Sequence, residues 1–152
     1  MKLSLKFPPV AQGIVAILLI WLFDRYTPLY HIKFIYQSIV VWALIGTGVI
    51  VALSGIFAFI KLNTTVDPRC PEKASKLVII GIYKYSRNPM YLGLLLVITG
   101  IAVYSGSLSS IFVVASFVAF ITKYQIVPEE VALQEIFGES YAHYVQKVRR
   151  WL

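Results

Sequence analysis

The chain has 152 residues, of which 59% are hydrophobic and only 14% are charged. A soluble domain of average composition is about 25% charged, so this composition excludes an ordinary soluble protein and predicts an integral membrane protein. The net charge of +7 comes from basic residues in short segments beside apolar runs. Because these residues form no large solvated basic face, we expect membrane head groups as their partners and no nucleic acid.

The length allows one compact helical unit, so we expect residues 1–152 to form a single integral membrane domain. The first apolar segment covers about residues 7–23 and follows Lys2 and Lys6. This segment resembles a signal peptide, but no small-residue cleavage site follows it. Since roughly 17 apolar residues are the lower limit for crossing a bilayer, we expect a retained first span.

The second span is predicted over residues 36–60, which carry no charge. Its small residues are Gly46, Gly48, Ser54 and Gly55. Small residues let helix backbones approach closely, either within one chain or in a homo-oligomer, which the sequence permits. A pore or substrate path lined by these glycines is the functional alternative.

A polar connection over residues 61–89 carries six basic and two acidic side chains. It is too long for a simple turn, and long connections in compact proteins often carry function. Its apolar stretch at residues 77–80 is expected to lie in the membrane interface or to re-enter the protein. Cys70 is the single cysteine, and His31 and His143 are isolated in the sequence, so we expect no metal site.

The third and fourth spans are predicted over residues 90–104 and 108–126, with a tight turn at residues 105–107. The sequence from Asn88 to Thr122 contains no charged residue, which predicts a helical hairpin buried in lipid. Pro128 then predicts the start of a new helix, because proline is tolerated in a first helical turn.

The C-terminal segment predicts an amphipathic helix, because apolar residues recur at spacings of three and four. This stripe consists of Leu133, Phe137, Tyr141, Tyr144 and Val148. Glu129 lies four residues before Leu133 and is therefore expected on the same inward face. Gly138 predicts a break that divides this helix into two pieces.

The distribution of basic residues indicates the orientation in the membrane. The N-terminal segment and residues 61–89 are basic, whereas residues 24–35 carry only Arg25 and Lys33 and the turn at residues 105–107 carries no charge. Basic loops stay on the cytoplasmic side. The sequence therefore predicts four spans, with both termini and the amphipathic C-terminal helix on the cytoplasmic side.

Two polar motifs lie at the edges of the apolar segments. The first runs from Gly81 to Gly93, and the second begins at Pro128 and contains Glu129 and Glu130. Ionisable groups packed against a membrane span are costly to desolvate, so they are functional candidates. An arginine, paired carboxylates and glycines that admit close backbone approach predict a site for a small charged cofactor.

At these residues the chain resembles the superfamily of isoprenylcysteine carboxyl methyltransferases and phospholipid methyltransferases. That superfamily carries an Arg-His-Pro-x-Tyr-x-Gly motif before a helical hairpin and a Glu-Glu pair after it. Here the first motif reads Arg87-Asn88-Pro89-Met90-Tyr91-Leu92-Gly93, and the pair is Glu129-Glu130. Residues 63–66 and the pattern Phe137-Gly138-x-x-Tyr141-x-x-Tyr144 resemble small bacterial members, so the resemblance covers about residues 64–152.

The resemblance implies an all-α polytopic fold and S-adenosylmethionine as methyl donor, bound by residues 63–93 and 120–152. It also implies a lipid or lipidated small molecule as acceptor, and the bacterial inner membrane as location. The expected cofactor-binding residues are Gly81, Tyr83, Arg87, Pro89, Tyr91, Gly93, Glu129 and Glu130. The expected catalytic residues are Arg87, Asn88, Tyr91 and Glu130.

Individual roles follow from the chemistry of the donor. Arg87 is expected to bind its carboxylate, because a planar guanidinium suits that group. Glu129 and Glu130 are expected to bind its ammonium, a ribose hydroxyl or an amine acceptor. Asn88 replaces the histidine of the motif, and asparagine forms hydrogen bonds but does not titrate near neutral pH. The eukaryotic enzymes also have an arginine shortly before the Glu-Glu pair, where this chain has Lys123 as its nearest cation.

Other interpretations stay open at the level of sequence. Arg87 can simply extend to the head groups, and the Glu-Glu pair can simply favour a helix N-terminus. O-methylation of a carboxylate needs a nearby cation such as Lys84 or Lys123, whereas N-methylation of an amine needs a carboxylate. The other classes considered are a nicotinamide-dependent membrane reductase of related architecture and a small four-helix transporter. A transporter needs an ionisable group within a span, and the predicted spans have none away from their ends.

Overall fold

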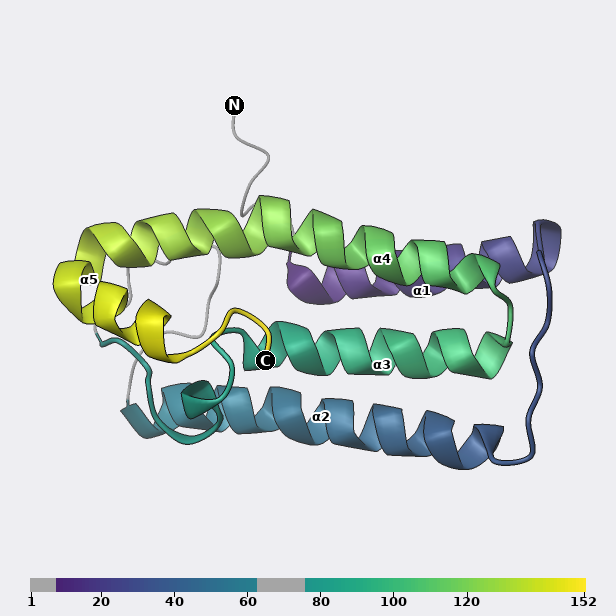
Figure 1. Ribbon diagram of the computed structural model, residues 1–152, viewed down its shortest axis with the longest axis horizontal. Coiled ribbons are helices and arrows are strands. Elements are labelled where there is room, and N and C mark those ends of the chain that lie inside the picture. Colours follow the sequence, from purple (N-terminus) through teal and green to yellow (C-terminus); the bar gives the residue numbers. More distant parts are fainter. Residues whose placement is uncertain (1–7, 63–75) are drawn as a thin grey trace.

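The computed structural model describes residues 8–62 and 76–152, and Figure 1 shows these residues as a bundle of long helices lying side by side. The elements are α1 (Pro9–Tyr26), α2 (Gln37–Leu62), the 3₁₀ turn η2 (Gly81–Lys84), α3 (Pro89–Ser105), α4 (Ser109–Ile121), the π-helical turn η3 (Thr122–Ile126) and α5 (Val127–Lys147). The prediction of an all-α membrane protein is confirmed. Lys2, Lys6, Cys70 and residues 63–66, on which some predictions rest, lie outside the described residues.

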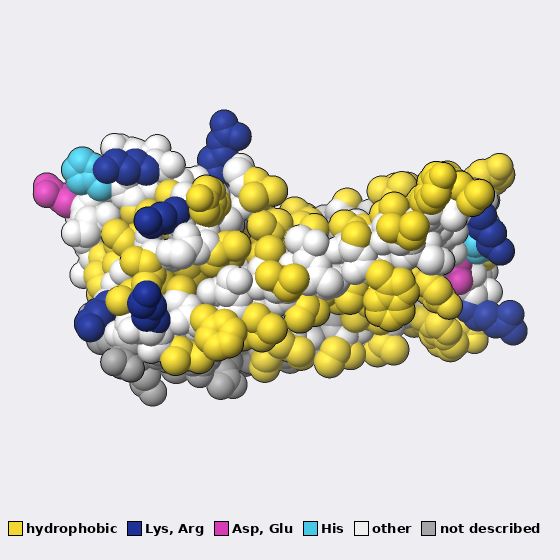
Figure 2. Space-filling model, turned by 90° about the horizontal axis from the view of Figure 1, so that it is seen from below, with side chains coloured by type: hydrophobic (Ala, Val, Ile, Leu, Met, Phe, Trp, Pro, Cys, Tyr) yellow, Lys and Arg dark blue, Asp and Glu magenta, His cyan; other side chains and the backbone are white. Residues whose placement is uncertain are grey.

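In the described part of the chain, three helices are long and apolar enough to cross a membrane, and α3 is a shorter apolar helix. Hydrophobic side chains cover the middle of the face in Figure 2, while basic side chains gather toward the two ends of the molecule. This distribution suits a bilayer, because the hydrocarbon core excludes charge and the head groups attract it. Helices α1, α2 and α3 begin and end within three residues of the spans predicted for them, and α4 together with the π-helical turn covers residues 109–126 of the fourth. The agreement arises because the length of an apolar run reflects the thickness of the hydrocarbon core.

Helix α3 occupies the centre of the bundle, with α2 on one side and α1 and α4 on the other (Figure 1). Gly93 makes the contact with α2 possible, because a Cβ atom built there would lie 2.4 Å from the backbone oxygen of Gly48. The predicted close approach of small residues is therefore confirmed at Gly48 and at Gly55, which meets Met90. Gly46 has nothing within 4 Å and contributes no packing of this kind.

The helices alternate in direction, so the start of α1, the end of α2, the start of α3 and the end of α4 share one end of the bundle, here called the site end (Figure 1). At the opposite end, Asp24 joins two loops, because its carboxylate accepts a hydrogen bond from Ser105 at 3.0 Å and contacts His31 at 2.9 Å. The backbones of residues 30–32 and 106–108 also pair there. The far end of the bundle is thus fastened by polar contacts.

The chain stays helical from Ser109 to Lys147, so the new helix predicted at Pro128 begins without a gap. Proline lacks the backbone N–H and its ring crowds the carbonyl four residues earlier. The π-helical turn absorbs this conflict, because the N–H of Val127 bonds five residues back to the oxygen of Thr122. The helical run from Ser109 to the residue before Gly138 is about 43 Å long, which exceeds a hydrocarbon core of about 30 Å, so we expect the spanning part to end near Ile126, with α5 beyond it.

The predicted break at Gly138 is confirmed, since its φ of 50° and ψ of −123° are not helical. After this break the chain returns toward the start of α3, and the C-terminus ends beside it (Figure 1). The predicted inward stripe is also confirmed, because Tyr141, Tyr144 and Val148 are buried together with Leu133 and Phe137 against them. The bend therefore brings the second sequence motif onto the first.

Candidate functional site

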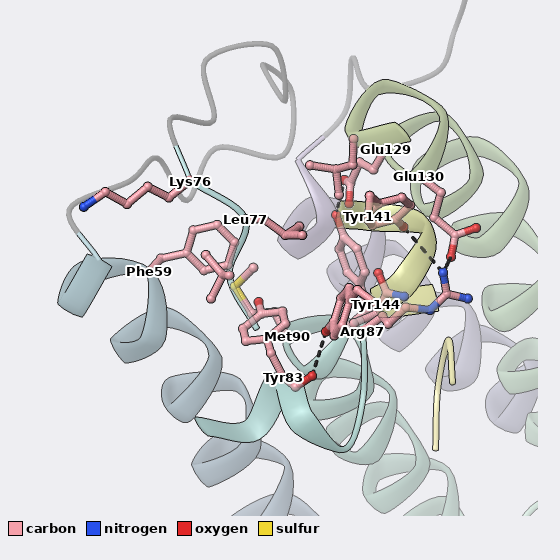
Figure 3. Close-up of a pocket in the computed structure, with 14 residues that line it drawn as sticks. Phe59, Lys76, Leu77, Tyr83, Arg87, Met90, Glu129, Glu130, Tyr141 and Tyr144 are labelled. Atoms are coloured by element: carbon pink, nitrogen blue, oxygen red, sulfur yellow. Dashed lines mark hydrogen bonds and ion pairs between the residues drawn. The ribbon is translucent and has the colours of Figure 1, made fainter. Parts of the chain in front are cut away.

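A pocket opens at the site end where the two sequence motifs meet (Figure 3). Its walls come from the end of α2, the segment leading into α3, and α5. The cavity has a volume of about 90 Å³. Its lining residues are Phe59, Lys76, Leu77, Val78, Tyr83, Arg87, Asn88, Met90, Tyr91, Glu129, Glu130, Leu133, Tyr141 and Tyr144.

The 3₁₀ turn supplies Tyr83, which is 5% exposed. Gly81 begins this turn with a positive φ of 60°, a conformation that favours glycine. The rings of Tyr83 and Phe59 pack edge to face, with their centroids 5.5 Å apart. The backbone oxygen of Tyr83 accepts a 2.7 Å hydrogen bond from the hydroxyl of Tyr144. Burial raises the pKa of the Tyr83 phenol well above its usual value, so this hydroxyl stays protonated.

Two hydrogen bonds tie the C-terminal residues to the first motif, and a third lies within that motif. The backbone N–H of Arg87 donates to the backbone oxygen of Arg149 at 3.0 Å. The side-chain amide of Asn88 donates to the backbone oxygen of Arg150 at 3.0 Å, while its own N–H donates to the hydroxyl of Ser86 at 3.1 Å. These bonds satisfy the polar groups of a buried chain crossing and fix the direction in which α3 begins.

Glu130 lies between two arginines that come from different motifs. Arg150 holds it with two hydrogen bonds, Nε to Oε1 at 3.0 Å and Nη2 to Oε2 at 2.6 Å. Arg87 approaches the same carboxylate at 3.1 Å, and the two side chains point toward one another in Figure 3. The hydrogen bonding that Arg150 donates to Glu130 raises the pKa of Arg150, which keeps the guanidinium charged. The carboxylate of Glu130 is therefore already engaged.

Glu129 has a different environment. Its Oε1 accepts hydrogen bonds from the hydroxyl of Tyr91 at 2.5 Å and from the side-chain amide of Gln125 at 2.8 Å. Within residues 8–62 and 76–152, no basic side chain forms an ion pair with it. Burial raises the pKa of Glu129 to about 7, although the two hydrogen bonds oppose this shift. Two hydrogen bonds thus hold this carboxylate in place, and the described part of the chain gives it no cationic partner.

The structure brings six of the predicted residues together around the pocket: Tyr83, Arg87, Asn88, Tyr91, Glu129 and Glu130. The other three do not line it. Gly81 begins the adjoining turn, Pro89 is the first residue of α3, and Gly93 faces α2. Their contribution is to the path of the backbone around the site.

Sequence reasoning missed Gln125 and Arg150 as site residues. Gln125 is 1% exposed in an otherwise apolar core, and it lies one helical turn before Glu129. A polar residue four positions before a candidate carboxylate was a usable signal. For Arg150, only its return to Glu130 after the bend at Gly138 shows its partner.

Comparisons with known proteins agree with this arrangement. The sequence model of the family described as phospholipid methyltransferase matches residues 36–140, which include both motifs. A protein of Haemophilus influenzae described as uncharacterized is 41% identical over 63 residues, which is 41% of this chain and all of that protein. No solved structure matches the chain.

Proposed function

This chain belongs to the phospholipid methyltransferase family, and from that premise we propose that it transfers a methyl group from S-adenosylmethionine to an acceptor that carries a lipid chain. The observation that carries the proposal is that Arg87 of the first motif and Glu129 of the second line one pocket. The family match lends no support to the reductase or the transporter.

The polar groups of the pocket suit the charges of the donor, which has a carboxylate, an ammonium and a sulfonium. Among the described residues, the Nε–H of Arg87 is buried without a hydrogen-bond partner, so a donor carboxylate can satisfy it. Glu129, which forms no ion pair with another described residue, provides a carboxylate for a cationic group. The rings of Tyr83, Tyr141 and Tyr144 provide π faces that attract a positively charged sulfur.

The size of the pocket sets a condition on binding. Ligand pockets usually measure about 300–1,000 Å³, whereas this cavity measures about 90 Å³. Leu77 packs on Tyr141 and Tyr144, and the neighbouring Val78 packs on Ala58. We therefore expect residues 76–78 to move away from α5 when a nucleoside enters.

An amine is the acceptor that these residues favour. Among the described residues, Arg87 lines the pocket but is paired with Glu130, and the exposed Lys84 and Lys123 do not line it. Lys76 also lines the pocket, but its amino group points away from Glu129 in Figure 3, so no described cation stands beside Glu129 to hold a carboxylate acceptor. Glu129, in contrast, can hold an ammonium group and accept the proton that nitrogen must lose before it attacks. When bound, the donor supplies a methyl group on a positively charged sulfur. A bond from nitrogen to the methyl carbon then forms as the bond from carbon to sulfur breaks.

The basic residues also support a proposal for topology. Lys76, Lys84, Arg87, Lys123, Lys147, Arg149 and Arg150 belong to the site end, whereas Arg25 and Lys33 belong to the opposite loops. By the positive-inside tendency, the site end faces the cytoplasm of a bacterial inner membrane. Labelling of intact cells with an impermeant maleimide tests this orientation. The variants lack Cys70 and carry one introduced cysteine, either at Leu152 or at Tyr104.

The experiment that tests the proposed function is titration calorimetry of the detergent-purified protein with S-adenosylhomocysteine. We expect saturable binding by the wild type, and a loss of about tenfold or more in Arg87→Ala, because a charged hydrogen bond to a buried partner disappears. Lys84→Ala, an exposed basic residue outside the pocket, is the matched control and should bind like the wild type. A folded wild type that binds no S-adenosylhomocysteine, with lipid restored, would contradict the proposal.

A further inference from the structure

A second cavity lies on the opposite side of α3 from α2, as a groove between α1 and α4. Its volume is about 470 Å³, within the range of roughly 300–1,000 Å³ that ligand sites occupy. The groove is almost entirely apolar and is lined by Val15, Leu19 and Phe23 of α1 and by Phe112, Ser116 and Phe120 of α4. In a membrane such a groove faces lipid, so hydrocarbon is the material that fills it.

The groove has a polar end, and that end leads to the pocket. Gln12 lines the groove, and its side-chain amide donates to Oε1 of Gln125 at 3.4 Å. The amide of Gln125 donates in turn to Glu129, which also accepts from Tyr91. A buried amide in an apolar core is unfavourable unless it is hydrogen-bonded, so Gln125 needs both of these partners. A row of polar side chains therefore runs from the groove to the pocket.

The length of the groove matches one leaflet of a bilayer. From Gln12 to Phe23 the helix rises by about 17 Å. Half of a hydrocarbon core is about 15 Å. One acyl chain is about as long as that half, so a single chain that begins at the polar end of the groove would lie along the length of the groove.

We propose that this groove holds one hydrocarbon chain of the methyl acceptor, with Gln12 and Gln125 contacting its polar head beside Glu129. This inference rests on the proposed function. It adds where the hydrocarbon chain of the acceptor is bound and between which helices the acceptor enters. The acceptor reaches the site laterally, between α1 and α4, while the donor is bound by residues of the motifs. Bulk lipid without a preferred position, or a second copy of the chain, are the other possible occupants.

The test uses a lysophosphatidylethanolamine with a diazirine at the end of its single saturated chain. Wild-type protein in detergent micelles is photolabelled, and the labelled peptides are identified by mass spectrometry. We compare Val15→Trp, which fills the groove, with Ile14→Trp, which faces away from it; the two residues are 55% and 54% exposed, so neither change disturbs the core. A second pair on the opposite wall is Ser116→Phe against Ala115→Phe.

We expect label on peptides of α1 and α4 in the wild type, a decrease of about tenfold in Val15→Trp and Ser116→Phe, and no change in the two controls. Equal labelling in all variants, or label spread over the outer face of α2 as strongly as over the groove, overturns the inference. Binding of S-adenosylhomocysteine is measured on the same samples. Groove labelling without that binding leaves the lipid site standing and contradicts the proposed function, whereas binding without groove labelling contradicts the lipid site alone.

Discussion

The side-chain amide of Asn88 donates a hydrogen bond to the backbone oxygen of Arg150, 62 positions further along the chain. Asn88 is 9% exposed and stands at the residue before α3 begins. It thus joins the first motif to the returning C-terminus without carrying charge. The superfamily that this chain resembles has a titratable histidine at this position. Here the position is Asn88, and its hydrogen bonds hold the backbone in place. The arrangement suits a reaction in which Glu129, and not residue 88, receives the proton.

We expect Asn88→Ala to destabilise the protein by about 1–2 kcal/mol, because it leaves the partly buried carbonyl of Arg150 without its donor. Thermal unfolding followed by circular dichroism measures this effect. Gln134→Ala removes a hydrogen bond of similar chemistry to the oxygen of Gly138, but at an exposed position. Its unfolding temperature should stay within the error of the wild type, and equal losses in both variants would show that burial is not the cause.

Arg150 is expected to matter for donor binding although it does not line the pocket. Arg150→Ala releases Glu130, which then competes with the donor carboxylate for Arg87. Since part of the Arg150 side chain is exposed, solvent screens the pair, and we expect the Kd for S-adenosylhomocysteine to rise about fivefold. Arg149→Ala is the matched control, because only the backbone of Arg149 contacts the first motif. If both variants bind alike, Glu130 does not compete for Arg87.

The pKa of Glu129 predicts a pH dependence of stability. Burial raises this pKa from 4.5 to about 7, so between these values the folded state holds a proton that the unfolded state has released. The free energy of unfolding therefore falls as the pH rises from about 5 to about 8, by up to roughly 3 kcal/mol from this group. Glu129→Gln should lack this decrease. Parallel unfolding-temperature profiles for the two proteins across that range would contradict the assignment.

Two glycines on facing helices give opposite predictions. Gly93→Ala drives a Cβ atom against the backbone of Gly48 and should destabilise by about 1–3 kcal/mol, since neither backbone can yield. Gly46→Ala meets nothing within 4 Å and should stabilise by up to about 1 kcal/mol through helix propensity. Thermal unfolding of the two variants in the same detergent is the measurement. A neutral Gly93→Ala would mean that α2 and α3 are more loosely packed than described.

The sequence was sufficient to locate the helices, because a bilayer imposes a length on apolar runs that a soluble core does not. It was also sufficient to bring Arg87 and Glu129 to one site, through motifs on either side of a single hairpin. The role of Gly93 could not be read in the same way. A glycine signals close approach, but only the structure tells whether the approaching group is a ligand or, as here, the backbone of α2.

The sequence also did not reveal which residues pair with the charged side chains of the site. The two adjacent glutamates differ in their surroundings, since Glu130 meets two arginines and Glu129 meets a tyrosine and a glutamine. That difference depends on the sharp bend at Gly138, which brings Arg150 back to Glu130. The spacing of residues in the sequence does not specify the angle of this bend. The bend itself was predictable from glycine, but its direction was not.

The π-helical turn at Thr122–Ile126 has a consequence for how this protein can change over generations. Such a turn holds one residue more than an α-helical turn, so the loss of one residue there leaves the helices on either side in nearly the same register. Loss of a single codon there would therefore keep both glutamates near α3, whereas a second deletion would rotate everything after it by about 100° around the helix axis. In this part of the gene, a first single-codon deletion is expected to be tolerated more often than a second.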